Sequence, residues 1–236
     1  MYKNSLIFNG IEFGDYGVIE KIERNAISGI DLTTKKVLNR NGAIYYGNQL
    51  QPLNIVFSIR LFSRYKLEEL INNLAAGMYS EELKPLNYNG YITWYDAVLQ
   101  SLGETNIWRS ETALLQPSFF VPDPIARSKD RKSISASEHK FYLEGNYPVR
   151  PIYKATNVTD YSIINERSEE FITVNLPQSQ DIWVNSENQS IYNSNGESLM
   201  KYIDWQSTFF DVYHGDNLFI TAPTKIVYYE RFMYDK

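Results

Sequence analysis

The sequence contains no cysteine and only two histidines among its 236 residues. Without cysteine there is no disulfide framework and no thiolate metal site, which fits a protein made in a reducing cytoplasm. His139 and His214 stand far apart and outside any H-E-x-x-H spacing, whereas zinc needs several nitrogen, sulfur or oxygen ligands. His214 also lies in a Tyr-His-Gly-Asp-Asn run that is typical of a turn. We therefore expect no metal and no cofactor.

Long apolar runs and an excess of positive charge are also missing. No window approaches the roughly 18 apolar residues of a membrane span, and the first residues lack the basic and apolar regions of a signal peptide. The formal net charge is −5, whereas nucleic-acid binders usually present a basic surface. These absences argue against a membrane protein and against specific nucleic-acid recognition.

Motifs of common catalytic sites do not occur either. The sequence has no G-x-S-x-G elbow, no G-x-G-x-x-G turn and no P-loop. Glycan hydrolysis needs only two suitably placed carboxylates, so a glycan hydrolase stays open as an alternative. Candidates for such a pair are Glu169, Glu170, Asp181 and Asp204. The main expectation is a protein without catalytic residues.

One oxygen-rich segment could in principle bind calcium. It contains Asn185-Ser186-Glu187-Asn188, followed by Asn193, Asn195 and Gly196. The acidic residues of an EF-hand are not in their order here, and only one carboxylate lies among the amides. A hairpin with Asn-Gly at its tip explains the segment better.

The sequence does contain a dominant strand pattern. Apolar and polar residues alternate from Leu53 to Phe62, which predicts a half-buried strand. Shorter alternation covers residues 171–176 and 181–185, and residues 91–99 and 226–232 are apolar on both faces, as in central strands. The predicted fold class is therefore mainly β.

Only one helix is predicted, over residues 65–79. Its apolar residues follow the spacing of a single helical stripe: Leu67, Leu70, Ile71, Leu74, Ala75 and Met78. Ser63 can cap the N-terminus of this helix, and Pro85 prevents its extension. We expect Leu67, Leu70, Leu74 and Met78 to be buried against a sheet that includes residues 53–61.

Two domains are expected from the chain length and from a polar stretch with flanking prolines in the middle. Residues 1–125 are predicted to form a β-sandwich-like domain with the single helix, and residues 126–144 a polar linker. Residues 145–236 are predicted to form a smaller β-sandwich. Its turns are marked by Asn157, by Asn195-Gly196 and by Gly215-Asp216-Asn217.

Aromatic residues make up 15% of the sequence, and 19 of them are tyrosines. Tyrosine favours strands and is enriched in protein interfaces, so this content fits an ordinary β protein or a subunit with much interface. Four aromatic residues of the second half could stack on a sugar or contact a partner: Trp183, Tyr202, Trp205 and Tyr213. Buried core positions are the more frequent fate of such residues, and a carbohydrate-binding module stays an alternative.

Several short segments of the first half stand in an order that carries a family resemblance. They are Phe8-Asn9-Gly10-Ile11, Asp15-Tyr16, Ile22-Glu23-Arg24, Asn39-Arg40-Asn41-Gly42-Ala43, Tyr46-Gly47, the strand 52–61, the helix 65–79, Lys84-Pro85-Leu86, Tyr95-Asp96-Ala97-Val98-Leu99 and Phe120-Val121-Pro122-Asp123-Pro124. With these segments the first half resembles the N-terminal domain of the distal tail (Dit) proteins of siphophages that infect Gram-positive bacteria. The second half resembles the family's galectin-like C-terminal domain more faintly, through residues 145–148, 215–217 and 225–234.

The resemblance implies a structural protein of a siphovirus tail, a baseplate hub and not an enzyme. It implies a hexameric ring through which DNA passes without specific binding. The implied partners are further copies of the chain, the tail tube protein, a tail-tip fibre or tail-associated lysin protein, and a receptor-binding protein. Assembly would take place in the bacterial host cytoplasm, and the final location would be the virion tail tip.

The hairpin segment Leu32–Gln49 is predicted to be an oligomer contact. It is too polar for a core and too aromatic for an idle loop. Arginine and tyrosine often dominate interface energies. The predicted interface residues are Arg40, Asn41, Gly42, Tyr45 and Tyr46.

Overall fold

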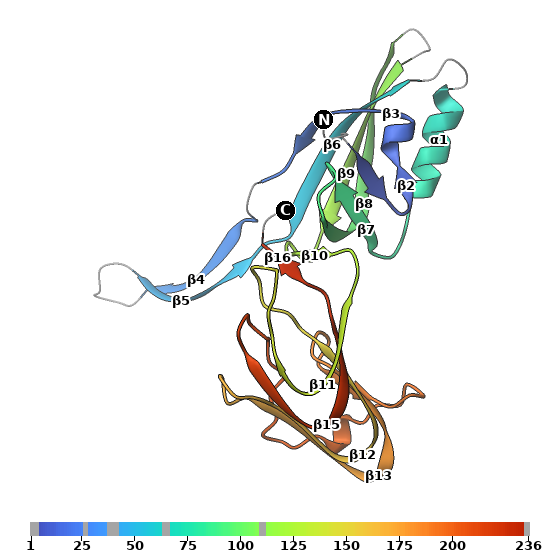
Figure 1. Ribbon diagram of the computed structural model, residues 1–236. Coiled ribbons are helices and arrows are strands. Elements are labelled where there is room, and N and C mark those ends of the chain that lie inside the picture. Colours follow the sequence, from blue (N-terminus) through green and yellow to red (C-terminus); the bar gives the residue numbers. More distant parts are fainter. Residues whose placement is uncertain (1–4, 26–27, 37–42, 63–66, 109–111, 234–236) are drawn as a thin grey trace. The chain divides into compact units, whose positions relative to one another are not determined.

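The computed structural model describes residues 5–25, 28–36, 43–62, 67–108 and 112–233. The chain divides into two compact units, of which the first comprises Met1–Ala126 with Met233–Lys236 and the second Arg127–Phe232. Figure 1 shows that strands make up most of both units. The prediction of a mainly β fold is confirmed.

The first unit is built on an antiparallel sheet with the strand order β2-β1-β7-β8-β9-β6-β3. The strands are β1 (Leu6–Phe8), β2 (Ile11–Glu12), β3 (Gly17–Glu23), β6 (Leu53–Phe62), β7 (Lys84–Tyr88), β8 (Thr93–Trp108) and β9 (Thr112–Val121). A short 3-10 helix, η1 (Phe13–Asp15), joins β2 to β3. The predicted alternating strand is β6, and its odd-numbered residues from Leu53 to Leu61 are buried.

This sheet bends over itself and encloses an aromatic core. Phe8 in β1 and Phe119 in β9 are three strand positions apart, which in a flat sheet means a separation of about 14 Å. Their ring centroids are only 4.6 Å apart. Phe57 in β6 and Tyr88 in β7 also meet edge to face, at 5.5 Å. The closed shape agrees with the predicted β-sandwich-like first domain.

The predicted helix is α1 (Leu67–Met78), and it is the one α-helix in the described part of the chain. Residues 65–66 and the predicted cap Ser63 lie outside the described residues. The buried stripe consists of Leu67, Ile71, Leu74 and Met78. The predicted burial of Leu70 is wrong, because this residue lies at the border of the stripe and is only half-buried. The last turn of α1 is fixed to the β1–β2 turn, where the Asn9 side-chain amide donates a hydrogen bond to Gly77 O (2.9 Å).

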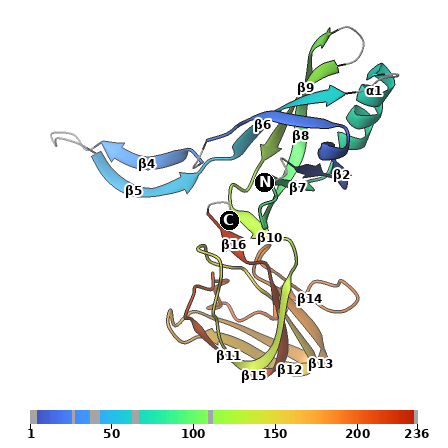
Figure 2. The same ribbon diagram turned by 45° about the horizontal axis from the view of Figure 1, so that its top comes forward.

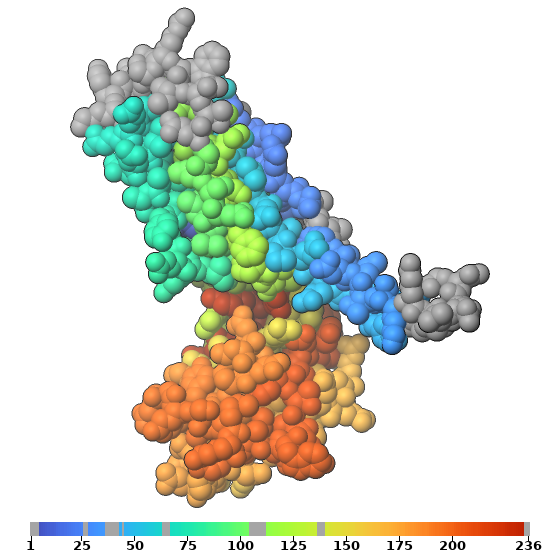
Figure 3. Space-filling model, turned by 180° about the vertical axis from the view of Figure 1, so that it is seen from behind, coloured from blue at the N-terminus to red at the C-terminus, as the bar shows by residue number. Residues whose placement is uncertain are grey.

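Strands β4 (Ile30–Lys36) and β5 (Ala43–Leu50) form a separate antiparallel ribbon, which we call the arm. Each of the two strands pairs only with the other in the described part of the chain. Figures 1 and 2 show the arm leaving the sheet of the first unit between β3 and β6, and its blue surface is visible in Figure 3. The arm therefore belongs to the first unit without contributing to the core of that unit.

The second unit contains one five-stranded antiparallel sheet with the order β11-β15-β12-β13-β14. The strands are β11 (Lys132–Lys140), β12 (Ile152–Asn165), β13 (Phe171–Asn185), β14 (Ser190–Tyr192) and β15 (Asn217–Tyr228). Apolar residues of the segments 141–149 and 199–212, which include the 3-10 helix η2 (Met200–Tyr202), complete the core of this sheet. The galectin-like assignment of this unit stays a prediction.

Two details of the second unit differ from the sequence-based expectation. Residues 126–144 are not a linker, because they contain β10 (Ala126–Ser128) and β11, and β11 is paired along its length with β15. The charged residues of this stretch led to the prediction of a linker, whereas the stretch forms a strand with polar residues on its exposed face. Asn157 marks no turn but a bulge inside β12, with φ at 54°. Its N–H donates to Asp181 Oδ1 (3.1 Å), and its side-chain oxygen accepts from Ser179 (2.8 Å).

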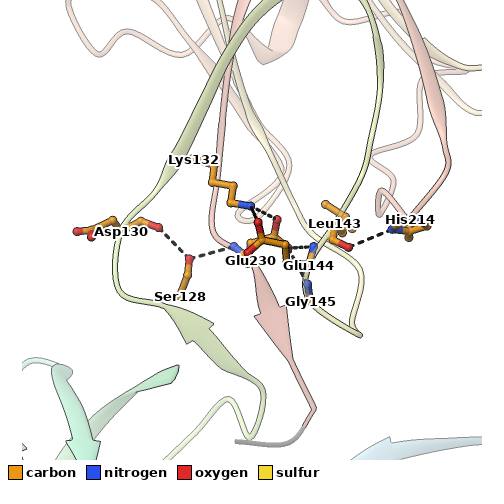
Figure 4. Close-up of polar contacts among 8 residues, drawn as sticks. All are labelled: Ser128, Asp130, Lys132, Leu143, Glu144, Gly145, His214 and Glu230. Carbon is orange, nitrogen blue, oxygen red and sulfur yellow. Dashed lines mark hydrogen bonds and ion pairs between the residues drawn. The ribbon is translucent and has the colours of Figure 1, made fainter. Parts of the chain in front are cut away.

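A buried carboxylate closes the second unit where the chain enters and leaves it (Figure 4). Glu230 is 1% exposed, and its Oε2 accepts hydrogen bonds from the N–H groups of Glu144 (3.1 Å) and Gly145 (3.0 Å). Its Oε1 lies 2.9 Å from Lys132 Nζ, which also reaches Glu144 at 2.9 Å. Burial lowers the pKa of the Lys132 ammonium, but the hydrogen bonds and charges of the two carboxylates outweigh this and leave the pKa raised.

The backbone around Glu230 is equally constrained. The Ser128 N–H donates to Glu230 O (2.8 Å), and the Glu230 N–H donates to Ser128 Oγ (3.2 Å). Gly145 passes so close to Arg231 that a Cβ atom at this position would lie 2.1 Å from the Arg231 carbonyl oxygen. A side chain larger than glycine would therefore displace the strand that leaves the unit.

Candidate functional site

The arm is two-faced, and its faces follow from its register. Residues two apart in a strand share a face, and so do directly opposite residues of an antiparallel pair. Ile30 pairs with Leu50, Leu32 with Asn48, and Thr34 with Tyr45. One face is therefore mostly apolar and carries Ile30, Leu32, Tyr45 and Leu50. The polar residues Asp31, Thr33, Lys35 and Gln49 lie on the opposite face.

The apolar face of the arm is largely open to solvent. The exposed fractions are 49% for Ile30, 63% for Leu32 and 57% for Tyr45. Solitary exposed apolar side chains are common, but a continuous stripe of them on one face of a ribbon marks a surface for association. We take this apolar face of the arm as the candidate functional site.

A bulge in β5 adds a second exposed tyrosine beside this face. The register shifts between Thr33, which opposes Gly47, and Thr34, which opposes Tyr45, so that Tyr46 is the extra residue. Tyr46 is 62% exposed. Gly47 has φ at 153°, a conformation that side chains other than hydrogen disfavour. In a regular strand Tyr45 and Tyr46 would point to opposite faces. The bulge instead places these two neighbouring tyrosines together.

The base of the arm is fixed by polar contacts. The buried Ser28 hydroxyl donates to Gln51 O, and the Gln51 N–H donates to Gly29 O (2.8 Å). The Gln51 side-chain amide donates to Asp31 Oδ1 at 2.6 Å. Next to these contacts lies a recess of about 640 Å³, lined by Lys21, Ile22, Glu23, Arg24, Asn25, Gly29, Gln51, Pro52, Leu53 and Asn54. The arm thus starts from a fixed base rather than from a loose loop.

The predicted interface residues fall partly on this surface. Tyr45 and Tyr46 lie in β5 with exposed side chains, whereas Arg40, Asn41 and Gly42 lie outside the described residues. The predicted interface residues did not include Ile30 or Leu32, although Leu32 begins the predicted contact segment. Their alternation with Asp31 and Thr33 is a strand signal, but it does not tell which face is left uncovered.

The four aromatic residues predicted as a sugar or partner surface do not share one face. Ile182 and Val184 point into the core, so Trp183 between them lies on the other face of β13, where Lys154 Nζ is 4.4 Å from its ring. Tyr202 packs against the core instead. Trp205 is 87% exposed and Tyr213 is 51% exposed. The structure therefore forms no common aromatic platform from these four residues.

Two of the acidic residues considered for hydrolysis lie far apart along one strand. Glu170 and Asp181 flank most of β13, eleven residues apart, or roughly 35 Å along an extended strand. A glycosidase needs its two carboxyl groups within about 10 Å. Asp204 accepts the N–H of Gln206 in its own turn (2.8 Å).

The oxygen-rich segment and His214 have structural roles. The Asn185 side-chain oxygen accepts the N–H groups of Glu187 (2.9 Å) and Asn188 (3.4 Å), which is a turn motif. His214 Nδ1 lies 3.0 Å from Leu143 O (Figure 4). The described residues contain no group of three acidic or histidine side chains that could hold a metal ion. No helix among them is long and apolar enough to cross a membrane.

Comparisons with known proteins point to phage tails. A family model of the siphovirus-type tail component, C-terminal domain, matches residues 144–232. The crystal structure of the SPP1 Dit protein, a hub of the adsorption apparatus in phages that infect Gram-positive bacteria, matches with a TM-score of 0.81 and 15% identity, over 97% of this chain and 98% of that chain. No curated protein matches the chain in sequence.

Two structures of the phage p2 baseplate in its activated conformation also share the fold. The structure with Ca matches with a TM-score of 0.53 and 10% identity, over 98% of both chains. The structure with Sr matches with a TM-score of 0.54 and 9% identity, over 97% of both chains. At these identities the structural matches concern the fold.

Proposed function

We propose that this chain, a Dit family protein by the match of its second unit and by its whole-chain fold, is a structural subunit of a phage baseplate hub. In this proposal several copies associate into a closed ring, and six is the number that the family resemblance implies. The subunit acts through geometry rather than catalysis.

The exposed apolar face of the arm is the observation that supports association. A ring with head-to-tail contacts requires two different complementary surfaces on each subunit. The arm provides one of them, a narrow apolar stripe with Leu32 and Tyr45 at its centre. Burial of such a stripe against a neighbouring subunit would remove apolar area from water, which is the main driving force of association.

The further parts of the proposal concern partners and location. The ring would join the tail tube protein to a tail-tip fibre or tail-associated lysin protein and to receptor-binding proteins, at the tail tip of a virion assembled in the host cytoplasm. DNA would pass through the channel without specific binding, and the net charge of −5 per subunit suits such passage because it gives no general attraction for phosphates.

Size-exclusion chromatography with light scattering tests the proposed ring directly. Six copies of a 27.5 kDa chain have a mass of about 165 kDa, whereas a carbohydrate-binding module or glycan hydrolase should remain near 27.5 kDa. The double variant Leu32→Ser, Tyr45→Ser should shift the mass to that of the monomer, because it makes the apolar face polar.

The matched control is the double variant Lys35→Ser, Gln49→Ser on the opposite face of the arm, which should leave the assembly intact. Assembly of the Leu32, Tyr45 variant at the wild-type mass would remove the arm from the interface. A monomeric wild-type protein at micromolar concentration would contradict the ring itself.

A further inference from the structure

Another exposed apolar surface lies in the first unit, outside the arm. It consists of Tyr16, Val18 and Phe62, which are 39%, 51% and 53% exposed. We call these three residues the patch. Tyr16 directly precedes β3, Val18 lies in β3, and Phe62 is the last residue of β6. The patch therefore spans two neighbouring strands, as the apolar face of the arm does.

The register of β3 and β6 brings the members of the patch together. Val18 pairs with Arg60 in this antiparallel ladder. The Phe62 N–H donates to Tyr16 O (3.2 Å), so that Tyr16 lies opposite Phe62 at the end of the ladder. Residues two apart in a strand share a face, and so do directly opposite residues. Ile19, the residue after Val18, is buried, so the patch belongs to the face that is turned away from the core.

The surroundings of the patch are fixed and carry no net charge. The Tyr16 N–H donates to Phe13 O (3.0 Å). Gly17 lies so close to β6 that a Cβ atom at this position would collide with the Arg60 carbonyl oxygen. Arg60 Nε lies 2.5 Å from Glu20 Oε1, which places a neutral ion pair beside Val18. An apolar centre with a polar and neutral rim suits an uncharged, apolar partner surface.

The patch and the arm lie at opposite ends of the same pair of strands. The arm leaves the sheet where β3 ends and β6 begins, whereas the patch lies where β3 begins and β6 ends. β6 is ten residues long, or roughly 30 Å. Figures 1 and 2 both show the arm running away from the end of β6 that leads to α1. The arm of a neighbouring copy can therefore reach the patch, whereas the arm of the same chain points away from it.

We propose that the patch of each subunit receives the apolar face of a neighbouring subunit's arm. This inference rests on the proposed function and names the surface that the arm contacts. A second copy of the chain fits the patch because the arm supplies an apolar face two strands wide, on which Leu32 and Tyr45 are exposed. Contact between two different surfaces at opposite ends of a subunit is head to tail, which is the kind of contact that can close a ring.

Mixing two variants that cannot assemble alone provides the test. The arm variant is Leu32→Ser, Tyr45→Ser, and the patch variant is Val18→Ser, Phe62→Ser. Each should be a monomer of 27.5 kDa by size-exclusion chromatography with light scattering, because each lacks one of the two surfaces. An equal mixture at high micromolar concentration should form a heterodimer of about 55 kDa, twice 27.5 kDa. The intact arm of the patch variant would meet the intact patch of the arm variant, and no further subunit could add.

The matched control is the double variant Leu83→Ser, Ile92→Ser. These apolar residues of the first unit are 50% and 64% exposed and flank β7, which β8 and β9 separate from β6. The control should assemble like the wild type. Thermal unfolding followed by circular dichroism should be alike for all monomeric variants, because only exposed side chains are replaced.

The outcomes separate this inference from the ring itself. If the wild type assembles and the patch variant assembles as well, the ring stands and the patch is not part of its interface. If both variants are monomeric but their mixture gives no heterodimer, the arm does not contact the patch, and the inference is overturned. A monomeric wild type overturns the ring and the inference together.

Discussion

The arm and the β12–β13 ribbon are two antiparallel pairs with similar alternation and opposite burial. In the arm, Leu32 is 63% exposed, whereas Ile163 and Ile172, which are cross-strand partners in β12 and β13, are completely buried. Strand alternation therefore indicates which residues share a face, but it does not indicate whether the same chain covers that face. In the second unit the cover comes from the segments 141–149 and 199–212, and the arm has no comparable segment among the described residues.

The second unit and the arm also differ in the hydrogen bonds of their polar groups. The second unit closes its core with buried carboxylates that bind backbone N–H groups, such as Glu230 and Asp216. In the described part of the arm, polar contacts fix its base, through Ser28 and Gln51. Stability should accordingly depend on the second unit's ribbon, and association on the arm.

The largest expected effect is a difference in the free energy of unfolding between side-chain truncations in the two ribbons. Ile172→Ala should lower the free energy of unfolding by about 2–5 kcal/mol, because it leaves a cavity in a closed core. Leu32→Ala should change it by less than about 0.5 kcal/mol in the monomer, because an exposed side chain leaves no cavity. Urea unfolding followed by circular dichroism, at a concentration that keeps the chain monomeric, measures both. Equal losses would show that the arm is covered by its own chain.

A smaller effect is expected from the carboxylate that closes the second unit. Glu230→Gln removes the charge that faces Lys132 and weakens the hydrogen bonds from two backbone N–H groups, which should cost about 1–3 kcal/mol. Glu144→Gln serves as its control, since the same ammonium contacts that carboxylate at 2.9 Å, but the Glu144 side chain is 76% exposed. An exposed ion pair contributes between about 0 and 1 kcal/mol. A loss in Glu144→Gln as large as in Glu230→Gln would mean that burial does not decide the contribution.

The smallest effect concerns two buried tyrosines of the second unit. The Tyr161 hydroxyl is 2.9 Å from Thr224 Oγ1, whereas the Tyr153 hydroxyl has no hydrogen-bond partner in the protein. Tyr161→Phe should therefore lower the stability by about 1 kcal/mol, and Tyr153→Phe should leave it unchanged or raise it by a similar amount. Differential scanning calorimetry of the two variants can resolve this difference in sign, and two equal losses would contradict it.

Tyr153 and Tyr161 also predict how the stability of the protein depends on pH. Burial raises the pKa of both phenols above the ordinary value of 10. Above pH 10 the unfolded chain releases these protons while the folded chain keeps them, so the stabilising effect present below pH 10 is lost as the pH rises. The decline in stability above pH 10 should be less steep in each single variant than in the wild type.

Much of the first unit could be predicted because its local patterns match its burial. In the strand 53–62 and in the helix, apolar residues recur with a period that places them on one face. Both elements are present, as β6 and α1, and that face is buried in each. Leu70 shows the limit of the method, since one residue at the border of a helical stripe fits the pattern equally well inside or outside it. Asn157 shows another limit, because an asparagine with a left-handed backbone conformation occurs in bulges as well as in turns.

The functional surfaces were harder to predict. The strand β11 was taken for a linker because charged and polar residues interrupt its apolar pattern, while its register with β15 is set by distant residues. Exposure of Ile30 and Leu32 is a property of the whole fold, so the sequence could name the hairpin but not the residues of its uncovered face.

A ribbon with an apolar face and unpaired strand edges carries a risk of uncontrolled growth into fibres. Among the residues that the structure describes, β4 and β5 have one partner strand each, so the outer edge of each is open to addition of further strands. The bulge at Tyr46 and Gly47 interrupts the ladder in its middle, and a straight strand laid along this edge would lose its register there. The feature that sets two tyrosines side by side thereby also limits edge-to-edge stacking, so that the arm is directed toward partners that recognise its face.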